Sequence, residues 1–144
     1  VRKRLREKSI PFTFAGWKLW FDDMRINTLH RTRLNELYNV LDLSLVSSRS
    51  EAGPHAILEA AAAKCPQLSS RVGIAEDVLL PSQIYDYDDV DTAVAKIEDD
   101  ILTGNLKANC PENYATVLSR HTAESCAKSY QEVYSMALAI GEEK

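Results

Sequence analysis

The sequence has few cysteines and lacks both a long hydrophobic run and a leader segment. Its three cysteines, Cys65, Cys110 and Cys126, are widely spaced and form neither a CxxC pair nor a Cys/His cluster. A disulfide framework and a zinc site are therefore disfavoured. No apolar run approaches the ~20 residues of a membrane span, and no charged-then-apolar segment with a small-residue cleavage site opens the chain. We expect a soluble, cytoplasmic protein with reduced thiols and no bound metal.

Glycine and proline are also sparse, and the sequence has neither an internal repeat nor a low-complexity segment. Its 144 residues are enough for a hydrophobic core, because a domain of this size buries roughly two thirds of its unfolded-chain surface. One domain over residues 1–144 is the expectation. The chain begins without methionine, inside the charged stretch VRKRLREK. We expect it to be a fragment of a longer protein.

Charge is unevenly placed along the chain. Residues 1–33 hold nine Lys/Arg and three Asp/Glu, whereas residues 34–144 hold eight and eighteen, so that +6 and −10 make up the net charge of −4. A basic arm can contact nucleic acid, an anionic membrane surface or another domain. VRKRLREK is short and poor in aromatic residues, which argues against nucleic acid. A membrane surface is not specifically indicated, and docking on another domain stays open.

Apolar spacing predicts strands that alternate with helices. Short apolar runs bounded by turn residues predict strands at 10–15, 43–48, 65–70 and 82–87. Helical spacing predicts helices at 32–41, 54–64, 90–103 and 111–118, a short helical segment within 72–79 and a last helix after Thr122. Residues 1–8 are also helix-like. We expect residues 17–30 to form a loop in which Trp17, Trp20 and Phe21 pack as an edge.

This order of elements predicts an α/β fold, a Rossmann-like parallel sheet flanked by helices and lacking its first strand. The acidic run Asp88–Asp91 suits a helix start and Gly104 a helix end. Residues 106–140 are expected to form the C-terminal helices. On the last of these, Tyr130, Val133 and Tyr134 are expected to pack on the core or on a missing domain, as part of one apolar stripe with Cys126, Ala137 and Ile140.

The loop Ser48–Pro54 joins a predicted strand to the alanine-rich helix at 54–64. In sheets of this kind, ligands bind where strands give way to helices. The unpaired N–H groups of a helix start, here those of His55, Ala56 and Ile57, together with the positive end of the helix dipole favour an anion, most naturally phosphate. We therefore expect a phosphate group at this helix start.

Two carboxylates flank that expected anion site. Glu51 lies outside the helix, where it can accept hydrogen bonds from the hydroxyl groups of a polyol. Glu59 lies in the second helical turn, one turn beyond His55 on the same face, where it can accept from a second pair of hydroxyls. A ligand of the form sugar, phosphate, ribose fits this order, and the pattern predicts a nucleotide sugar.

The stretch LYNVLDLSLVSSRSEAGPHAILEAAAAKCPQLSSRVGIAEDVL resembles the donor-binding segment of the GT-B glycosyltransferases, in particular the large retaining group called family four. It is similar to that group's Glu-x7-Glu signature, and a looser likeness runs from FTFAGW to the last helix. The resemblance implies the C-terminal half of a GT-B fold. It also implies a hexosyltransferase that takes its sugar from a nucleotide diphosphate, with retention at the anomeric carbon and without a metal or other cofactor.

The resemblance also implies roles for individual residues. Glu51, as the first signature glutamate, would contact the donor sugar beside the anomeric centre, and Glu59 would hold the ribose hydroxyls. The loop of Gly53, Pro54 and His55 would touch sugar and phosphate with its main chain, and the N–H groups of Ala56 and Ile57 would face the diphosphate. Gly16 and Trp17 match the loop near the nucleotide base.

The chain departs from the family pattern in several places. Gln67 stands where an apolar strand residue is common, Lys64-Cys65 replaces the usual Cys-Gly or His-Gly, and Ile74 follows Gly73 where the family has a second glycine. The basic pair that neutralises the diphosphate and the acceptor-binding N-terminal domain have no match. The resemblance therefore implies that this fragment alone transfers no sugar.

Two other functions stay open. Sugar-nucleotide epimerases share this architecture, and a fold does not determine a reaction. The chain could also be a non-catalytic interaction module that docks through its basic first segment. His55 is a candidate for a catalytic base, although its place at a helix start favours hydrogen bonding to the loop or to the donor.

Overall fold

The computed structural model describes residues 1–15, 25–26 and 30–142. Gly16, Trp17, Trp20 and Phe21 lie outside the described residues, so their predicted roles stay predictions. The expectation of a loop over residues 17–30 is wrong at one place, because Arg25–Ile26 forms strand β2. β2 pairs in parallel with β1, Phe14–Ala15. A strand was predicted at 10–15, and β1 covers only its last two residues.

A three-stranded parallel sheet lies at the centre of the fold. Its strands are β3 (Ser44–Val46), β4 (Gln67–Ser70) and β5 (Ile84–Tyr85), in the order β3-β4-β5. Ser44 is level with Gln67, and Ser69 is level with Ile84. All three were predicted from short apolar runs, and the parallel pairing follows from the helices that separate them.

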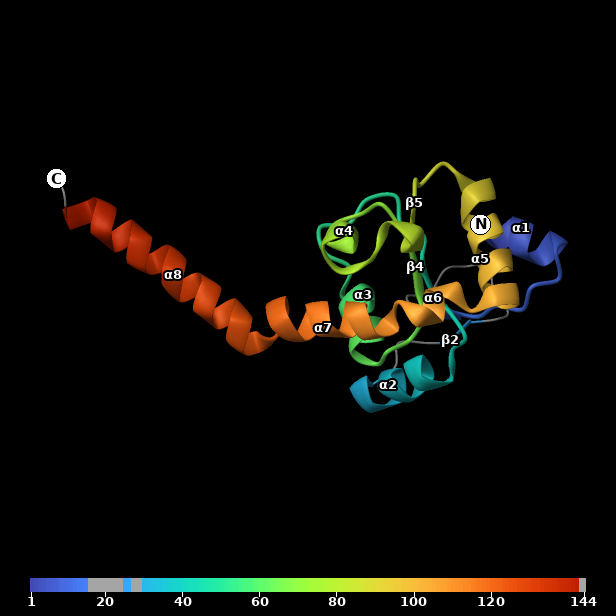
Figure 1. Ribbon diagram of the computed structural model, residues 1–144, viewed down its shortest axis with the longest axis horizontal. Coiled ribbons are helices and arrows are strands. Elements are labelled where there is room, and N and C mark those ends of the chain that lie inside the picture. The colour runs from blue at the N-terminus through green and yellow to red at the C-terminus, as the bar shows by residue number, and fades with distance from the viewer. Residues whose placement is uncertain (16–24, 27–29, 143–144) are drawn as a thin grey trace.

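Helices cover both faces of this sheet (Figure 1). The longest ones within the fold begin and end close to the predicted residues, because their apolar spacing is regular. One face is covered by α1 (Arg2–Glu7), α5 (Val90–Thr103) and α6 (Asn105–Ala108), and the other by α3 (His55–Ala62), α4 (Ala75–Val78) and α7 (Cys110–Arg120). The short helix α6 lies at the start of the range 106–140 that was predicted for the C-terminal helices, and the 3-10 turn Pro81–Gln83 was not predicted.

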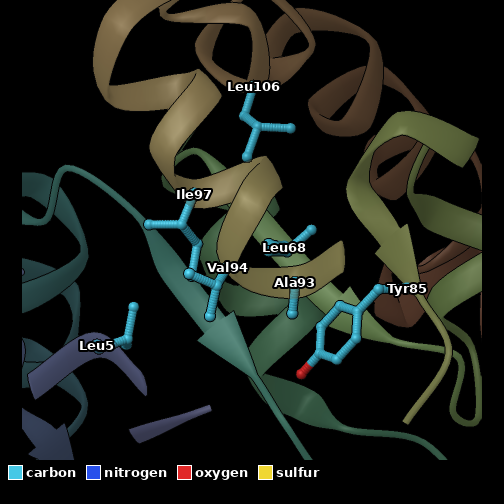
Figure 2. Close-up of a cluster of buried hydrophobic side chains, with 7 residues drawn as sticks. All are labelled: Leu5, Leu68, Tyr85, Ala93, Val94, Ile97 and Leu106. Atoms are coloured by element: carbon cyan, nitrogen blue, oxygen red, sulfur yellow. The ribbon is translucent and has the colours of Figure 1, made fainter. Parts of the chain in front are cut away.

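Successive side chains of a strand point to opposite faces of the sheet. Leu45 and Tyr85 pack toward α1 and α5, whereas their neighbours Val46 and Ile84 pack toward α3, α4 and α7. Figure 2 shows the first of these clusters, in which Leu5 of α1 and Val94 and Ile97 of α5 lie together with side chains of the sheet. The two clusters explain why the strands carry apolar residues on both faces.

Helix α2 (Arg31–Val40) packs against α3 through a third, smaller cluster around Tyr38, Ala60 and Cys65. Gln67, at the start of β4, is 1% exposed, and its carbonyl accepts a hydrogen bond from Nε2 of buried Gln83 at 3.2 Å. This bond reaches only the main chain of Gln67, and among the described residues the buried side-chain Nε2 of Gln67 has no hydrogen-bond partner.

The basic arm at the N-terminus packs on the acidic helix α5. Nη2 of Arg4 lies 2.8 Å from Oδ1 of Asp91, and Nζ of Lys8 lies 2.7 Å from Oε1 of Glu98. Such exposed pairs stabilise a fold by no more than about 1 kcal/mol each. The burial of Leu5 in the α5 cluster contributes more to holding α1 in place.

Helix α8 (Ala123–Glu142) projects away from the body of the molecule (Figure 1). Its predicted N-cap is confirmed, since Oγ1 of Thr122 accepts a hydrogen bond from the N–H of Ser125 at 3.1 Å. The expectation that its apolar stripe packs on the core of this chain is wrong. Tyr130 and Val133 are 62% exposed and Tyr134 is 67% exposed, because the helix turns away after α7.

No helix in the described part of the chain combines the length and the apolar character needed to span a bilayer. The same residues contain no cluster of three or more His, Cys, Asp or Glu side chains that could hold a metal ion.

Candidate functional site

Three parallel strands end at one edge of the sheet, and the connections that follow them leave from that edge. β3 leads into residues 47–54 and α3, β4 into residues 71–74 and α4, and β5 into residues 86–89 and α5. Ligands of open α/β sheets bind at this edge. Every described residue that we selected for donor binding lies on the first connection or on α3.

The start of α3 offers main-chain donors to that edge. Pro54 is the N-cap residue with φ −67°, and its side chain is buried. The N–H of Ile57 donates to the carbonyl of Pro54 at 3.0 Å, and the Ile57 side chain is fully buried in the core. The described residues provide no acceptor for the N–H groups of His55 and Ala56. These two groups are the donors that a ligand can use here.

Glu51 lies on the loop that leads into α3, and its side chain is exposed. The hydroxyl of Ser48, three residues earlier, donates a hydrogen bond to Oε1 of Glu51. A carboxylate held by one oxygen keeps acceptor capacity on the other, so Glu51 can still bind a hydroxyl group of a ligand.

Glu59 lies on the exposed side of α3, and its partner comes from α2. The hydroxyl of Tyr38 donates to Oε2 of Glu59 at 3.3 Å. Burial, followed by the negative charge of Glu59, raises the pKa of Tyr38. The phenol therefore stays protonated and remains a donor to the carboxylate. Sequence reasoning placed Tyr38 only on an apolar helix face and missed this contact.

A close backbone approach supports the loop that carries Glu51. Gly73, in the turn after β4, has φ +48°, and a Cβ atom there would lie 2.8 Å from the carbonyl oxygen of Ala52 and 2.9 Å from that of Glu51. Only glycine meets both conditions without strain. Ile74, which stands where the family has a second glycine, lies beside Gly53, with Cγ2 at 3.9 Å from the place of a Cβ atom on Gly53.

Two arginines lie on the connections at this edge, and neither was selected from the sequence. Arg71 forms ion pairs with Glu76 and, at 2.8 Å, with Asp86, which neutralise its charge. The guanidinium of Arg49 lies over the ring of Tyr87 at 5.5 Å from its centroid, a cation–π contact between the connections after β3 and β5. The spacing of these residues along the chain gives no sign of either arrangement.

An open depression of about 630 Å³ lies elsewhere, between the Pro81–Gln83 turn, α5 and α6. None of the predicted donor-binding residues lines it. Lys96 is one of its lining residues, and Nζ of Lys96 donates to the carbonyl of Ser82 at 2.7 Å. We place the candidate site at the start of α3, because Glu51, Glu59 and the unpaired N–H groups of His55 and Ala56 lie there and none of them lines the depression.

Comparisons with known proteins agree with this fold. The sequence model of the family described as glycosyl transferases group 1 matches residues 25–116, which is more than half of the chain. The crystal structure of the C-terminal domain of a glycosyl transferase group 1 family protein, LpcC from Francisella tularensis, is similar, with a TM-score of 0.61 and 15% sequence identity. The similarity covers 85% of this chain and 60% of that one.

At 15% identity this likeness is one of fold, and it confirms the predicted α/β architecture with its parallel sheet and flanking helices. The chain spans less than two thirds of the similar structure. A search of curated proteins found no match.

Proposed function

This chain belongs to the family of glycosyl transferases group 1, and on that premise we propose that it binds the nucleotide-sugar donor of a retaining glycosyltransferase. The observation that carries the proposal is the arrangement around the start of α3. The unpaired N–H groups of His55 and Ala56 lie there, and in sequence order they fall between the exposed residues Glu51 and Glu59. A diphosphate between two hydroxyl-bearing sugars needs this order of donors and acceptors.

In the proposed complex, the N–H groups of His55 and Ala56 bind the diphosphate, aided by the dipole of α3. Glu59 accepts hydrogen bonds from the ribose hydroxyls, and Glu51 accepts from the hydroxyls of the transferred sugar. Gly53 and Pro54 line the sugar with their main chain. Trp17 is proposed to lie near the base, and the N–H of Ile57 holds the first turn of α3 in place through Pro54.

The reaction we propose is hexosyl transfer with retention at the anomeric carbon. Negative charge develops on the diphosphate as the bond to the sugar breaks. Donors that already point at this charge stabilise the transition state more than the ground state. The helix start can supply this stabilisation without a metal ion or another cofactor.

Acceptor binding is proposed to require a second domain of the same protein. Helix α8 supports this proposal, since its large apolar side chains are about two thirds exposed in this chain. Exposed apolar surface of this extent marks interaction sites. On this proposal the isolated chain binds the donor weakly and transfers no sugar.

Donor binding can be tested by titrating the isotopically labelled chain with uridine or guanosine diphosphate and following the amide signals of His55 and Ala56 by NMR. We expect the signals to shift until the site is saturated. The affinity obtained from these shifts should fall about tenfold in Glu59→Gln, because one charged hydrogen-bond acceptor is lost. Glu112→Gln, an exposed change at the start of α7, is the matched control. Unchanged signals at millimolar nucleotide would contradict the proposal and favour an interaction module.

Transfer can be tested in the full-length protein with labelled donor sugars and candidate acceptors. A transferase moves the label to an acceptor, whereas an epimerase changes the sugar and leaves it on the nucleotide. Glu51→Gln should lower turnover and leave donor affinity nearly unchanged, and the reverse is expected for Glu59→Gln. Equal, negligible effects of both changes would contradict the proposed roles.

A further inference from the structure

The carboxylate of Glu51 stands at the end of a short series of hydrogen bonds that begins inside the sheet. The hydroxyl of Ser48 donates to Oε1 of Glu51. The carbonyl of Ser48 in turn accepts a hydrogen bond from Oγ of Ser70 at 2.7 Å. Ser70 is the last residue of β4 and is fully buried, so its position is set by the sheet.

A second buried hydroxyl holds the chain just before Ser48. The phenol of Tyr85, on β5, is 2% exposed and donates to the carbonyl of Val46 at 3.2 Å. Burial raises the pKa of Tyr85 to about 12, which keeps this donor protonated at any physiological pH. A buried polar group without a partner is costly, so both hydroxyls resist movement of the carbonyls that they bind.

The far side of the loop is held by backbone contact. The turn at Gly73 lies against the carbonyl oxygens of Glu51 and Ala52, with no room for a side chain between them. Residues 46–52 are therefore supported by a side chain from β4, by a side chain from β5 and by the turn after β4. Within the described part of the chain, this support reaches a carboxylate of the candidate site through the hydrogen bond from Ser48 to Glu51.

We propose that Ser48 is a positioning residue that directs the carboxylate of Glu51 toward the donor sugar, and that Ser70 acts through Ser48 by holding its main chain. The inference rests on the proposed function, because the orientation of the Glu51 carboxylate matters only if Glu51 binds the donor sugar. An exposed glutamate samples several rotamers at small cost. A fixed hydrogen bond to one of its oxygens selects among them, which is how supporting contacts keep reacting groups in place.

The expected effect is on turnover rather than on donor affinity. Small displacements of a group near the reacting centre cost up to about 100-fold in rate. In the full-length protein, Ser48→Ala should lower kcat by about tenfold or more while the KM for the donor changes less than about threefold. Ser48→Thr keeps a hydroxyl and should restore most of the rate. Ser70→Ala should lower kcat less, because it acts on Glu51 through Ser48.

Ser50→Ala is the matched control, since Ser50 is an exposed serine of the same loop beside Glu51. A second measurement, which does not depend on activity, follows the side-chain carboxyl carbon signal of Glu51 by NMR in the isolated chain. Ser48→Ala should shift this signal and Ser50→Ala should not. Thermal unfolding of each variant shows whether the loop change has disturbed the fold.

Each outcome bears on the proposal. A shifted Glu51 signal together with a lower kcat, both restored by Ser48→Thr, would support it. If Ser48→Ala matches Ser50→Ala in both measurements while the unmodified protein transfers sugar, the positioning role is overturned and the proposed function survives. If the Glu51 signal shifts in a protein that binds no nucleotide sugar, the hydrogen bond stands, but the proposed function and the positioning role both fail.

Discussion

The hydroxyl of Tyr38 on α2 donates a hydrogen bond to Oε2 of Glu59 on α3, across 3.3 Å. Glu59 is thus held from a neighbouring helix, and its second carboxylate oxygen remains available as an acceptor. The contact ties α2 to a residue of the candidate site.

Removing this contact should weaken nucleotide binding without unfolding the chain. In Tyr38→Phe, the Glu59 carboxylate loses a donor that orients it, and we expect the affinity for a nucleoside diphosphate to fall severalfold, because a hydrogen bond to a charged group contributes roughly 1 kcal/mol or more. Isothermal titration calorimetry measures this change. Tyr114→Phe, on α7, is the matched control. Unchanged affinity in Tyr38→Phe would show that the contact does not orient Glu59 for a ligand.

Gly73 and Gly104, which have positive φ, should respond differently to alanine. At Gly73 the added Cβ atom meets backbone oxygens at 2.8 and 2.9 Å, whereas at Gly104, with φ +68°, no atom lies within 4 Å. Gly104→Ala should lower the free energy of unfolding by about 1 kcal/mol, the cost of the left-handed conformation alone. Gly73→Ala should lower it further and should also disturb the loop of Glu51. Urea unfolding compares the two variants, and equal losses would mean that the close approach at Gly73 relaxes freely.

The N-cap of α5 should make a contribution to stability that depends on pH. Oδ1 of Asp89 accepts a hydrogen bond from the N–H of Thr92 at 2.9 Å, and Oδ2 accepts from its hydroxyl at 2.6 Å. These bonds, with the hydroxyl contact as the larger cause, lower the pKa of Asp89 in the folded state. The stabilisation is therefore present above the carboxyl pKa of the unfolded chain, near 4, and is lost as the pH falls through the lower folded value.

Asp89→Asn keeps a capping oxygen but does not titrate. We expect the difference in Tm between the unmodified chain and Asp89→Asn to be constant between pH 5 and 7 and to shrink below about pH 4. Differential scanning calorimetry at several pH values measures it. A difference that stays constant down to pH 2.5 would show that the charge of Asp89 plays no part.

The three cysteines should differ sharply in reactivity. Cys126 is exposed on α8, whereas Cys65 and Cys110 are buried. Burial raises the pKa of Cys65 to about 11 and also raises that of Cys110, so neither forms the reactive thiolate near neutral pH. A thiol reagent should label one cysteine rapidly in the native chain and all three in denaturant. Cys126→Ser should abolish the rapid phase, and a rapid phase that survives this change would contradict the burial of the other two.

The apolar face of α8 should matter little for the stability of this chain. Tyr130 and Val133 are 62% exposed, so replacing either with serine should change the free energy of unfolding by less than about 0.5 kcal/mol. Leu68→Ala, in the core, should cost about 2–5 kcal/mol. Equal losses would show that α8 folds back on the body. In the full-length protein, the serine variants are expected to lower activity if a second domain covers this face.

Much of the fold was predictable because its signals are local. The helix at 90–103 carries an acidic start, a regular apolar face and a glycine end, and α5 has the predicted bounds. The central strands were found from short apolar runs, although they are shorter than predicted. The strand at Arg25–Ile26 was missed, because two residues that pair with a distant strand leave no periodic pattern.

The candidate site was predictable in part for the same reason. Glu51, Glu59 and the start of α3 lie within one short stretch, so their spacing along the chain predicted their order around a ligand. The partners of these carboxylates could not be found in this way. Tyr38 and Ser70 are 21 and 22 residues from the groups that they contact, and their side chains are of kinds that occur in any core or strand.

The amino-acid sequence by itself determined which segments form helices and strands, that the strands pair in parallel, and which short stretch carries the two carboxylates beside a helix start. These depend on local spacing, on turn residues and on the helices that separate the strands. Only the tertiary structure decided that Tyr38 holds Glu59, that Ser70 and Gly73 support the loop of Glu51, and that the apolar face of α8 stays uncovered. These contacts depend on the distances between segments that are far apart in the chain, which only the packed fold sets.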